Sequence, residues 1–172
     1  MSDEWFDVVD EQDRVTGREL RREVHRRKLL HRAVHVLVFN RAGQVFLQKR
    51  SMKKDSAPGA WDSSASGHVD SGETYEGCAP RELREELGVE ATAPLEPLFK
   101  LPASEETAAE FVWVYRTRHD GPFVLHPDEI ERGAWFTPAE IDTALRERPA
   151  EFARSFRHVW SEVRRRGLAG QP

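Results

Sequence analysis

Carboxylates gather in the segment from Gly67 to Val89, whose sequence is GHVDSGETYEGCAPRELREELGV. In the helix predicted here, Glu82, Glu85 and Glu86 stand at positions i, i+3 and i+4, and they therefore lie within about 100° of arc on one face. Like charges at this spacing raise one another's pKa and destabilise a helix by roughly 0.2–0.5 kcal/mol per pair. A hard divalent cation removes that penalty, so the pattern indicates a metal site built from oxygen ligands.

The ligand set also indicates what binds beside the metal. Oxygen ligands with some retained waters suit Mg²⁺ or Mn²⁺, and Mg²⁺ typically takes one or two carboxylates together with the phosphate oxygens of a substrate. The spacing therefore predicts a small-molecule diphosphate that binds together with the metal. The alternative is a solvated acidic face with pairs such as Arg81–Glu85, which is the usual meaning of a charge-rich helix.

The glutamates belong to a longer frame. Gly67, then Glu73 after five intervening residues, then RELREELGV at residues 81–89 match every fixed position of the Nudix hydrolase signature, and the chain resembles that family. The resemblance implies an α/β (α+β) Nudix fold, in which a mixed β-sheet is sandwiched between helices. It also implies that the signature forms a loop, a helix and a second loop.

The resemblance assigns roles to the residues of the signature. The positions that correspond to the family's metal ligands are Glu82, Glu85, Glu86 and the backbone carbonyl of Gly67. Glu73 and Arg81 correspond to a pair that braces the loop against the helix. Beyond the signature, AVHVLVFNRAGQVFLQKR, the stretch 58–61 and GAWFTPAEI occupy the places of family strands.

The reaction implied is Mg²⁺-dependent hydrolysis of a diphosphate bond in a nucleoside diphosphate linked to another moiety, or in a related compound. The metal would neutralise the pyrophosphate and lower the pKa of a bound water, which attacks phosphorus with help from a carboxylate base. Two candidates for the base stay open: Glu86, and Glu110, which precedes FVWVY where some family members carry an extra acidic ligand. The expected catalytic set is Glu73, Arg81, Glu85, Glu86 and Glu110.

Cations and aromatic residues outside the signature are candidates for binding the substrate. Arg50, Lys53 and Lys54 border the long loop SMKKDSAPGAWDSSASG and can meet phosphate oxygens. Aromatic rings suited to stacking on a base belong to Trp61, Phe111 and Trp113. The alternatives are ordinary surface charge for the cations and core packing for the rings.

A second resemblance involves the N-terminal part. HRRKLLHRAVHVLVFN followed by PGAWDSSASGH is similar to type I isopentenyl diphosphate isomerase, a Nudix relative that moves a double bond by protonation and deprotonation. His25, His31 and His68 fall near the positions of that enzyme's three metal-binding histidines, and Glu110 falls near its catalytic glutamate. Whether these histidines bind a second metal stays open, because hydrogen-bonded or exposed histidines are the alternative.

Two positions depart from the isomerase pattern. Ser66 fills the place of its catalytic cysteine, and Ala108 replaces a metal-binding glutamate. A hydroxyl has neither the acidity nor the nucleophilicity of a thiol. Hydrolysis is therefore the main prediction, with isomerisation and a non-catalytic nucleotide-binding module as alternatives.

Strands and helices must position these residues. WFDVVDEQDRVTGREL predicts an N-terminal hairpin with its turn at residues 12–13, and AVHVLVFN and QVFLQKR predict a second hairpin. REVHRRKLL predicts a short helix or loop, while PLFKLPA and AEFVWVYRTRHDG predict further strands. A late start or a kink is expected at Pro80. Thr137 and Glu140 predict a capping box, and a final amphipathic helix is expected from about Pro149.

Length and composition complete the expectation. The 172 residues predict one domain, with a hairpin and basic segment over 1–32, a core over 33–146 that contains the signature at 67–89, and a C-terminal helix over 147–172. A net charge of −4 offers no basic field for nucleic acid, and no apolar run approaches the roughly 20 residues of a membrane span. The acidic N-terminus and single Cys78 favour the cytoplasm. A homodimer is possible, because many Nudix proteins pair.

Overall fold

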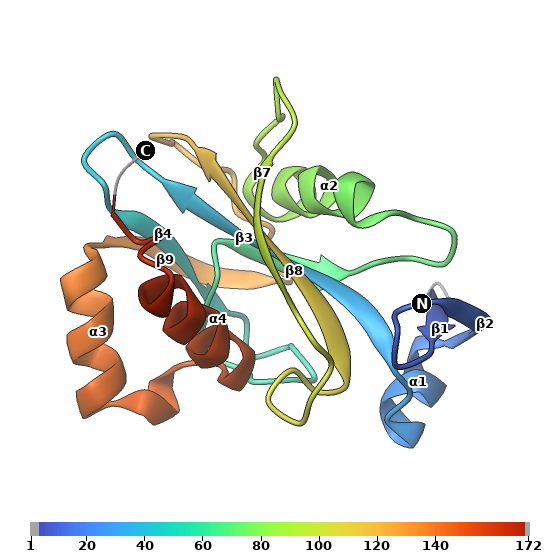
Figure 1. Cartoon of the computed structure of the whole chain (residues 1–172). Coiled ribbons are helices and arrows are strands. Elements are labelled where there is room, and N and C mark those ends of the chain that lie inside the picture. The colour runs from blue at the N-terminus through green and yellow to red at the C-terminus, as the bar shows by residue number, and fades with distance from the viewer. Residues whose placement is uncertain (1–3, 171–172) are drawn as a thin grey trace.

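The computed structural model describes residues 4–170, in which a mixed seven-stranded sheet forms the centre of the molecule (Figure 1). The order β5-β4-β3-β8-β7 is extended by β6, which pairs with β3, and by β9, which pairs with β4. The strands are β3 (His31–Phe39), β4 (Val45–Arg50), β5 (Trp61–Asp62), β6 (Ala65–His68), β7 (Glu96–Leu101), β8 (Glu110–Arg118) and β9 (Ile130–Phe136). β3 and β8 are parallel, and the other pairs are antiparallel.

Helices cover both faces of this sheet. Helix α2 (Tyr75–Leu87) packs on one face, and α3 (Pro138–Glu147) and α4 (Arg154–Arg165) lie on the other (Figure 1). The expected mixed sheet between helices is confirmed. None of the helices within residues 4–170 combines the length and the apolar character that crossing a membrane requires.

Alternation along β3 explains why the core has two halves. Ala33 and Leu37 belong to the cluster under α3 and α4, whereas Val34 and Val36 belong to the cluster under α2. Successive side chains of a strand point to opposite faces, so a strand buried on both sides is apolar throughout. The continuous and mostly apolar run AVHVLVF is typical of such a central strand.

A β-hairpin and a short helix precede the sheet. β1 (Trp5–Val9) and β2 (Val15–Leu20) form the predicted antiparallel hairpin, and α1 (Arg21–Arg27) follows it. The hairpin is a separate two-stranded sheet, and it lies beside the signature loop. Chain segments that are distant in sequence therefore meet at the N-terminal end of α2.

The helix ends confirm most predictions of capping and correct two others. Thr137 and Glu140 form the capping box of α3. The predicted late start of the signature helix is wrong, because Thr74 caps the first turn by accepting a hydrogen bond from the Gly77 amide at 3.1 Å, and Pro80 lies inside the helix. At the other end, Gly88 adopts a φ of 67°, the left-handed conformation that glycine accepts most easily.

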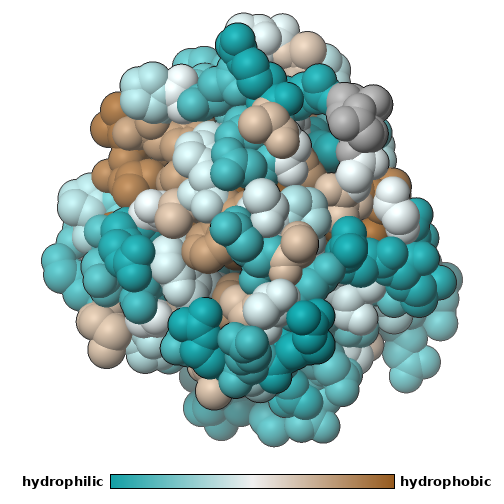
Figure 2. Space-filling model, turned by 90° about the vertical axis from the view of Figure 1, so that its left-hand side faces the viewer, coloured by the Kyte–Doolittle hydropathy of each residue, from teal (hydrophilic) through white to brown (hydrophobic). Residues whose placement is uncertain are grey.

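The last helix begins later than predicted. Residues 149–151 form a separate 3₁₀ turn, and α4 starts at Arg154. Phe152 between them is extended and pairs with Trp61 of β5. This pairing interrupts the helix, and it links segments too far apart for local sequence to reveal. The face of the molecule on the α3 side carries mostly polar residues (Figure 2).

Candidate active site

Glu86 lies on the buried side of α2, where two donors hold one of its oxygens. The Gln48 side-chain amide on β4 donates to Glu86 Oε2 at 2.7 Å, and the Ser66 backbone amide on β6 donates to the same oxygen at 3.1 Å. Burial raises the pKa of Glu86 to about 8, and the nearby Glu82 charge adds to the effect. Two uncharged donors therefore orient the carboxyl group, and neither offsets the charge of its ionised form.

Glu82 lies one turn earlier, against the backbone of β6. A Cβ atom at Gly67 would overlap with the Glu82 carboxylate, so only glycine allows this approach. Burial raises the pKa of Glu82 to about 7, although Arg81 opposes the rise. The arrangement brings the Glu82 carboxylate next to Gly67, whose carbonyl the family resemblance implies as a ligand.

Arg81 connects the signature loop with the helix. Its Nε donates to Glu73 Oε1 and its Nη2 to Glu73 Oε2, both at 2.8 Å, and Nη2 also donates to the His68 carbonyl at 3.0 Å. Its Nη1 donates to Glu82 Oε1 at 2.7 Å and to Glu85 Oε2 at 3.2 Å. The structure thus brings together the Glu73–Arg81 pair that the resemblance implies.

The donor set fits a hard divalent cation. Glu82 and Glu86 are mostly buried, while half of the Glu85 side chain is exposed. Arg81 hydrogen-bonds to Glu82 and Glu85 and is shared with Glu73, whereas the donors to Glu86 are the uncharged amides of Gln48 and Ser66. Burying several carboxylates with so little compensating charge is costly. Oxygen atoms from three carboxylates and a backbone carbonyl are ligands that Mg²⁺ and Mn²⁺ accept.

Three imidazoles meet beside the signature loop. His25 comes from α1, His31 from β3 and His68 from β6, and one ring nitrogen from each lies within 4.8 Å of the others. The Glu110 carboxylate at the start of β8 joins them, with its Oε1 atom 2.9 Å from His68 Nε2 and 3.4 Å from His31 Nε2. His31 Nε2 is buried and has no hydrogen-bond partner among the described residues.

The histidine cluster is defined as His25, His31, His68 and Glu110, and the surroundings of two of these groups displace their pKa values. Partial desolvation lowers the pKa of His25 to about 4, and the neighbouring His68 and His31 add to the effect. Burial opposes ionisation of Glu110, yet His31 and His68 hold its pKa well below the usual range. For His25 and Glu110, these shifts favour the uncharged imidazole and the ionised carboxylate, which are the forms that bind metals.

Phe6 of β1 closes the cluster from the N-terminal side. Its ring centroid lies 4.6 Å from that of His68, 5.8 Å from that of His31 and 6.1 Å from that of His25. The ring is almost completely buried. Phe6 thus covers one side of the cluster, in which His31 is buried, His68 is partly buried and His25 is exposed.

The predicted phosphate-binding cations are engaged with acidic groups. Arg50 donates to Asp62 Oδ2 at 3.1 Å, and Lys53 donates to Asp128 Oδ1 at 2.5 Å. Lys54 pairs with Glu129. A substrate phosphate would have to compete with these carboxylates, so a direct role of these cations stays a prediction.

The aromatic candidates lie in packed surroundings. Trp61 is 7% exposed and belongs to the core, and the Arg132 guanidinium lies 4.8 Å from its ring centroid. Phe111 is 8% exposed and lies under Lys100, whose nitrogen is 5.2 Å from the ring centroid. Stacking of a base on Trp61 would require Arg132 to move.

Sequence reasoning missed the residues that support the site. Gln48 carried one available signal, because alternation in β4 places it on the same face as Phe46, which packs under α2. The Ser66 amide and the Phe6 ring carried no local signal. Their roles arise from contacts between elements that are far apart in sequence.

A mixed sheet between helices, with Glu82, Glu85 and Glu86 on the helix that follows the signature loop, defines a hydrolase of the Nudix fold. Residues 29–156 match the family model described as the NUDIX domain, and the chain belongs to the Nudix hydrolase family. Members of this family generally use divalent metals and act on small molecules.

Relatives support this assignment. A Nudix hydrolase of Deinococcus radiodurans is 39% identical over 142 residues, which cover 82% of this chain and 83% of the relative. An uncharacterised Nudix hydrolase of Yersinia pestis is 37% identical over 138 residues, which cover 80% of this chain and 75% of the relative. The crystal structure of DR0079 from Deinococcus radiodurans superposes with a TM-score of 0.80 at 36% identity, covering 94% of this chain and 98% of that one.

Proposed function

We propose that this Nudix hydrolase splits a diphosphate bond in a nucleoside diphosphate linked to another moiety, with Mg²⁺ as its cofactor and Mn²⁺ as a possible substitute. The observation that carries the proposal is the pair of buried carboxylates, Glu82 and Glu86, beside Gly67. Their burial with so little compensating charge makes little sense for a solvated acidic face, which was the alternative.

Each residue of the site has a proposed role. Glu82, Glu85, Glu86 and the Gly67 carbonyl would hold the cation. When bound, Mg²⁺ supplies charge neutralisation of the diphosphate and a more acidic water. Gln48 fixes the Glu86 carboxylate, and Glu73 fixes Arg81 across the helix start. Ligands that are oriented before substrate binds reduce the reorganisation needed during the reaction.

Two candidates for the general base, Glu86 and Glu110, lie in different surroundings. Burial raises the pKa of Glu86 to about 8 in the metal-free protein, and a bound cation would oppose that rise. The pKa of Glu110 is instead held low, because His31 and His68 stabilise its ionised form against the effect of burial. A carboxylate of low pKa is a weak proton acceptor.

A nucleotide panel in the presence of Mg²⁺ tests the proposal. The wild-type chain should release phosphate products from at least one nucleoside diphosphate derivative, and Glu86→Gln should lower kcat at least about 100-fold. Glu90→Gln is the matched control, because Glu90 is exposed beyond the end of the same helix and should keep full activity. Unchanged turnover in Glu86→Gln, or no turnover by the wild type, contradicts the proposal.

The histidine cluster favours isomerisation of isopentenyl diphosphate as a second candidate function. Its nitrogen-rich donor set suits a borderline metal such as Zn²⁺ or Mn²⁺, and His31 Nε2, which makes no hydrogen bond among the described residues, is a donor atom that such a metal could take. Protonation of the double bond would then require an acid other than a thiol, since Ser66 stands at that position.

Solvent exchange distinguishes the two candidates. An isomerase incorporates deuterium from heavy water into isopentenyl diphosphate, which NMR detects, whereas a hydrolase releases phosphate. We expect phosphate release without exchange. Exchange that is lost in Glu110→Gln would favour isomerisation, and tight nucleotide binding with neither reaction would favour a binding module. The cytoplasmic location and the homodimer stay predictions.

A further inference from the structure

The N-terminal clasp, defined as residues 5–28, reaches the signature although the family model begins only at residue 29. Its first strand pairs with the loop that joins β6 to α2, through the antiparallel bridge between Phe6 and Asp70. The Ser71 amide donates to the Trp5 carbonyl at 2.8 Å. These backbone contacts place the clasp directly against the signature loop.

Asp7 makes the side-chain contacts of this junction. Its Oδ1 atom accepts a hydrogen bond from the Ser71 hydroxyl at 2.7 Å, and its Oδ2 atom accepts one from the Gly72 amide at 3.1 Å. Both oxygens of one carboxylate therefore hold consecutive residues of the loop. Gly72 has a φ of 82°, so the loop turns at the point where Asp7 holds it.

A short chain of contacts leads from this loop to the metal-binding carboxylates. The Asp70 amide donates to Glu73 Oε2 at 3.0 Å, and the Glu73 amide donates to the Asp70 carbonyl at 2.9 Å. Glu73 accepts two hydrogen bonds from Arg81, and Arg81 also donates one to Glu82. A shift of the loop would therefore move the Glu73 carboxylate and, through Arg81, the Glu82 carboxylate.

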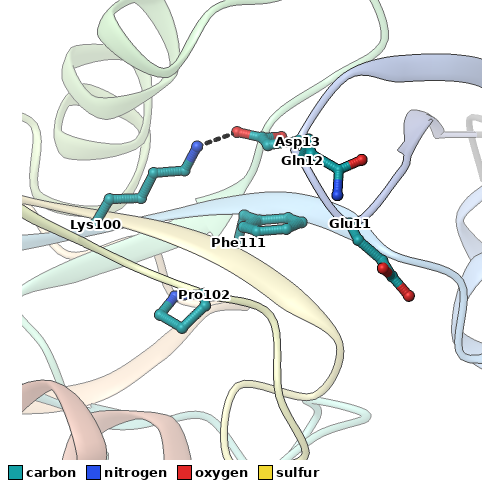
Figure 3. Close-up of a pocket in the computed structure, with 6 residues that line it drawn as sticks. All are labelled: Glu11, Gln12, Asp13, Lys100, Pro102 and Phe111. Atoms are coloured by element: carbon teal, nitrogen blue, oxygen red, sulfur yellow. Dashed lines mark hydrogen bonds and ion pairs between the residues drawn. The ribbon is translucent and has the colours of Figure 1, made fainter.

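The far end of the clasp is anchored to the start of α2. Asp13 at the hairpin turn accepts hydrogen bonds from Arg32 Nε at 2.6 Å and from the Tyr75 hydroxyl at 2.8 Å, and it pairs with Lys100 (Figure 3). Tyr75 is the first residue of α2. The clasp thus holds both the loop before the helix and the first residue of the helix.

We propose that Asp7 is a positioning residue for the metal site: by fixing the loop at Ser71 and Gly72, it sets the place of Glu73 and so of the Arg81–Glu82 pair. This inference rests on the proposed function, because it assumes that Glu82 is a metal ligand. The role is indirect, since no atom of Asp7 need touch the metal or the substrate.

Binding of Mn²⁺ to the whole protein, measured by electron paramagnetic resonance without substrate, tests this role. Asp7→Ala removes both acceptor oxygens and should weaken Mn²⁺ binding about threefold to tenfold. This loss is smaller than the one expected when a residue that directly supports a metal ligand is removed, because Asp7 acts through Glu73 and Arg81. Glu86→Gln, measured in parallel, identifies which part of the binding curve belongs to the glutamate site rather than to the histidine cluster.

Controls separate positioning from stability. Asp10→Ala alters the same hairpin, but the hydrogen bonds of Asp10 stay within its own turn, to residues 12 and 14, so Mn²⁺ binding should stay within about twofold. Asp7→Asn keeps an acceptor for the Gly72 amide and should recover most of the affinity. If Asp7→Ala does not fold, Ser71→Ala removes one of the two hydrogen bonds and should give a smaller shift in the same direction.

The outcomes distinguish the two proposals. Mn²⁺ binding by Asp7→Ala within about twofold of the wild type overturns the positioning role, even if the wild type hydrolyses nucleotides. An equal loss in Asp10→Ala also overturns it, because the clasp would then act through stability alone. In a further outcome, the wild type binds Mn²⁺ and Asp7→Ala weakens this binding, but the wild type hydrolyses no substrate. The positioning role then stands, and the proposed hydrolysis fails.

Discussion

At the scale of a single residue, Gly67 is important because it has no side chain. The Glu82 carboxylate occupies the space where a Cβ atom would lie, so the helix and β6 approach each other more closely than any other residue would allow. The sequence marked this position through the signature, but the reason for the glycine is a contact with a residue fifteen positions further along the chain. The missing side chain leaves room for the Glu82 carboxylate beside Gly67, whose carbonyl is proposed to bind the metal.

Replacing Gly67 by alanine should therefore damage both stability and metal binding. We expect the free energy of unfolding to fall by about 1–3 kcal/mol, as in other overpacked sites, and Mn²⁺ binding at the glutamates to weaken strongly. Gly17→Ala is the control, because no atom lies within 4 Å of the Cβ position in β2. Urea unfolding and Mn²⁺ titration measure the two effects. A Gly67→Ala variant as stable as Gly17→Ala would contradict the steric argument.

At the scale of the element, α2 shows what the sequence predicts well. Its buried stripe at Ala79, Leu83 and Leu87 and its glycine end follow from helical spacing and local chemistry, and the structure confirms both. Of the late start or kink predicted at Pro80, the late start was wrong, because Thr74 caps the first turn and the helix begins at Tyr75, although Pro80 has no N–H to donate to the Glu76 carbonyl. Local rules fail where a neighbouring residue compensates.

The elements that sequence reasoning placed wrongly or overlooked depend on distant partners. The start of α4 is set by the pairing of Phe152 with Trp61, which are far apart in the chain. The support of Glu86 by Gln48 requires β4 and α2 to pack, and the contact of Asp7 with the signature loop requires the hairpin to fold back. The sequence thus indicates candidate residues for the chemistry, whereas only the structure reveals the residues that contact and orient them.

At the scale of the whole molecule, the burial of Glu82 and Glu86 links stability to pH and to metal. Burial raises the pKa of Glu82 to about 7 and that of Glu86 to about 8, both above the ordinary value of 4.5. The folded state therefore binds protons that the unfolded state has already released, and stability falls as pH rises through the folded pKa values. His25 has the opposite effect, but only below its ordinary pKa of 6.5. The window between pH 6.5 and pH 8 isolates the two glutamates.

Metal-free protein should consequently lose stability across this window, by on the order of 2 kcal/mol for the two glutamates together. Excess Mg²⁺ should restore the loss at pH 8, because the cation takes the place of the protons and binds the folded state alone. Urea unfolding in the presence of a chelator, at both ends of the window and then with Mg²⁺, measures the effect. Glu86→Gln should flatten the dependence, since its amide does not titrate. Stability that stays constant or rises with pH in the metal-free wild type would show that these carboxylates are hydrated, and the case for a cation between them would fail.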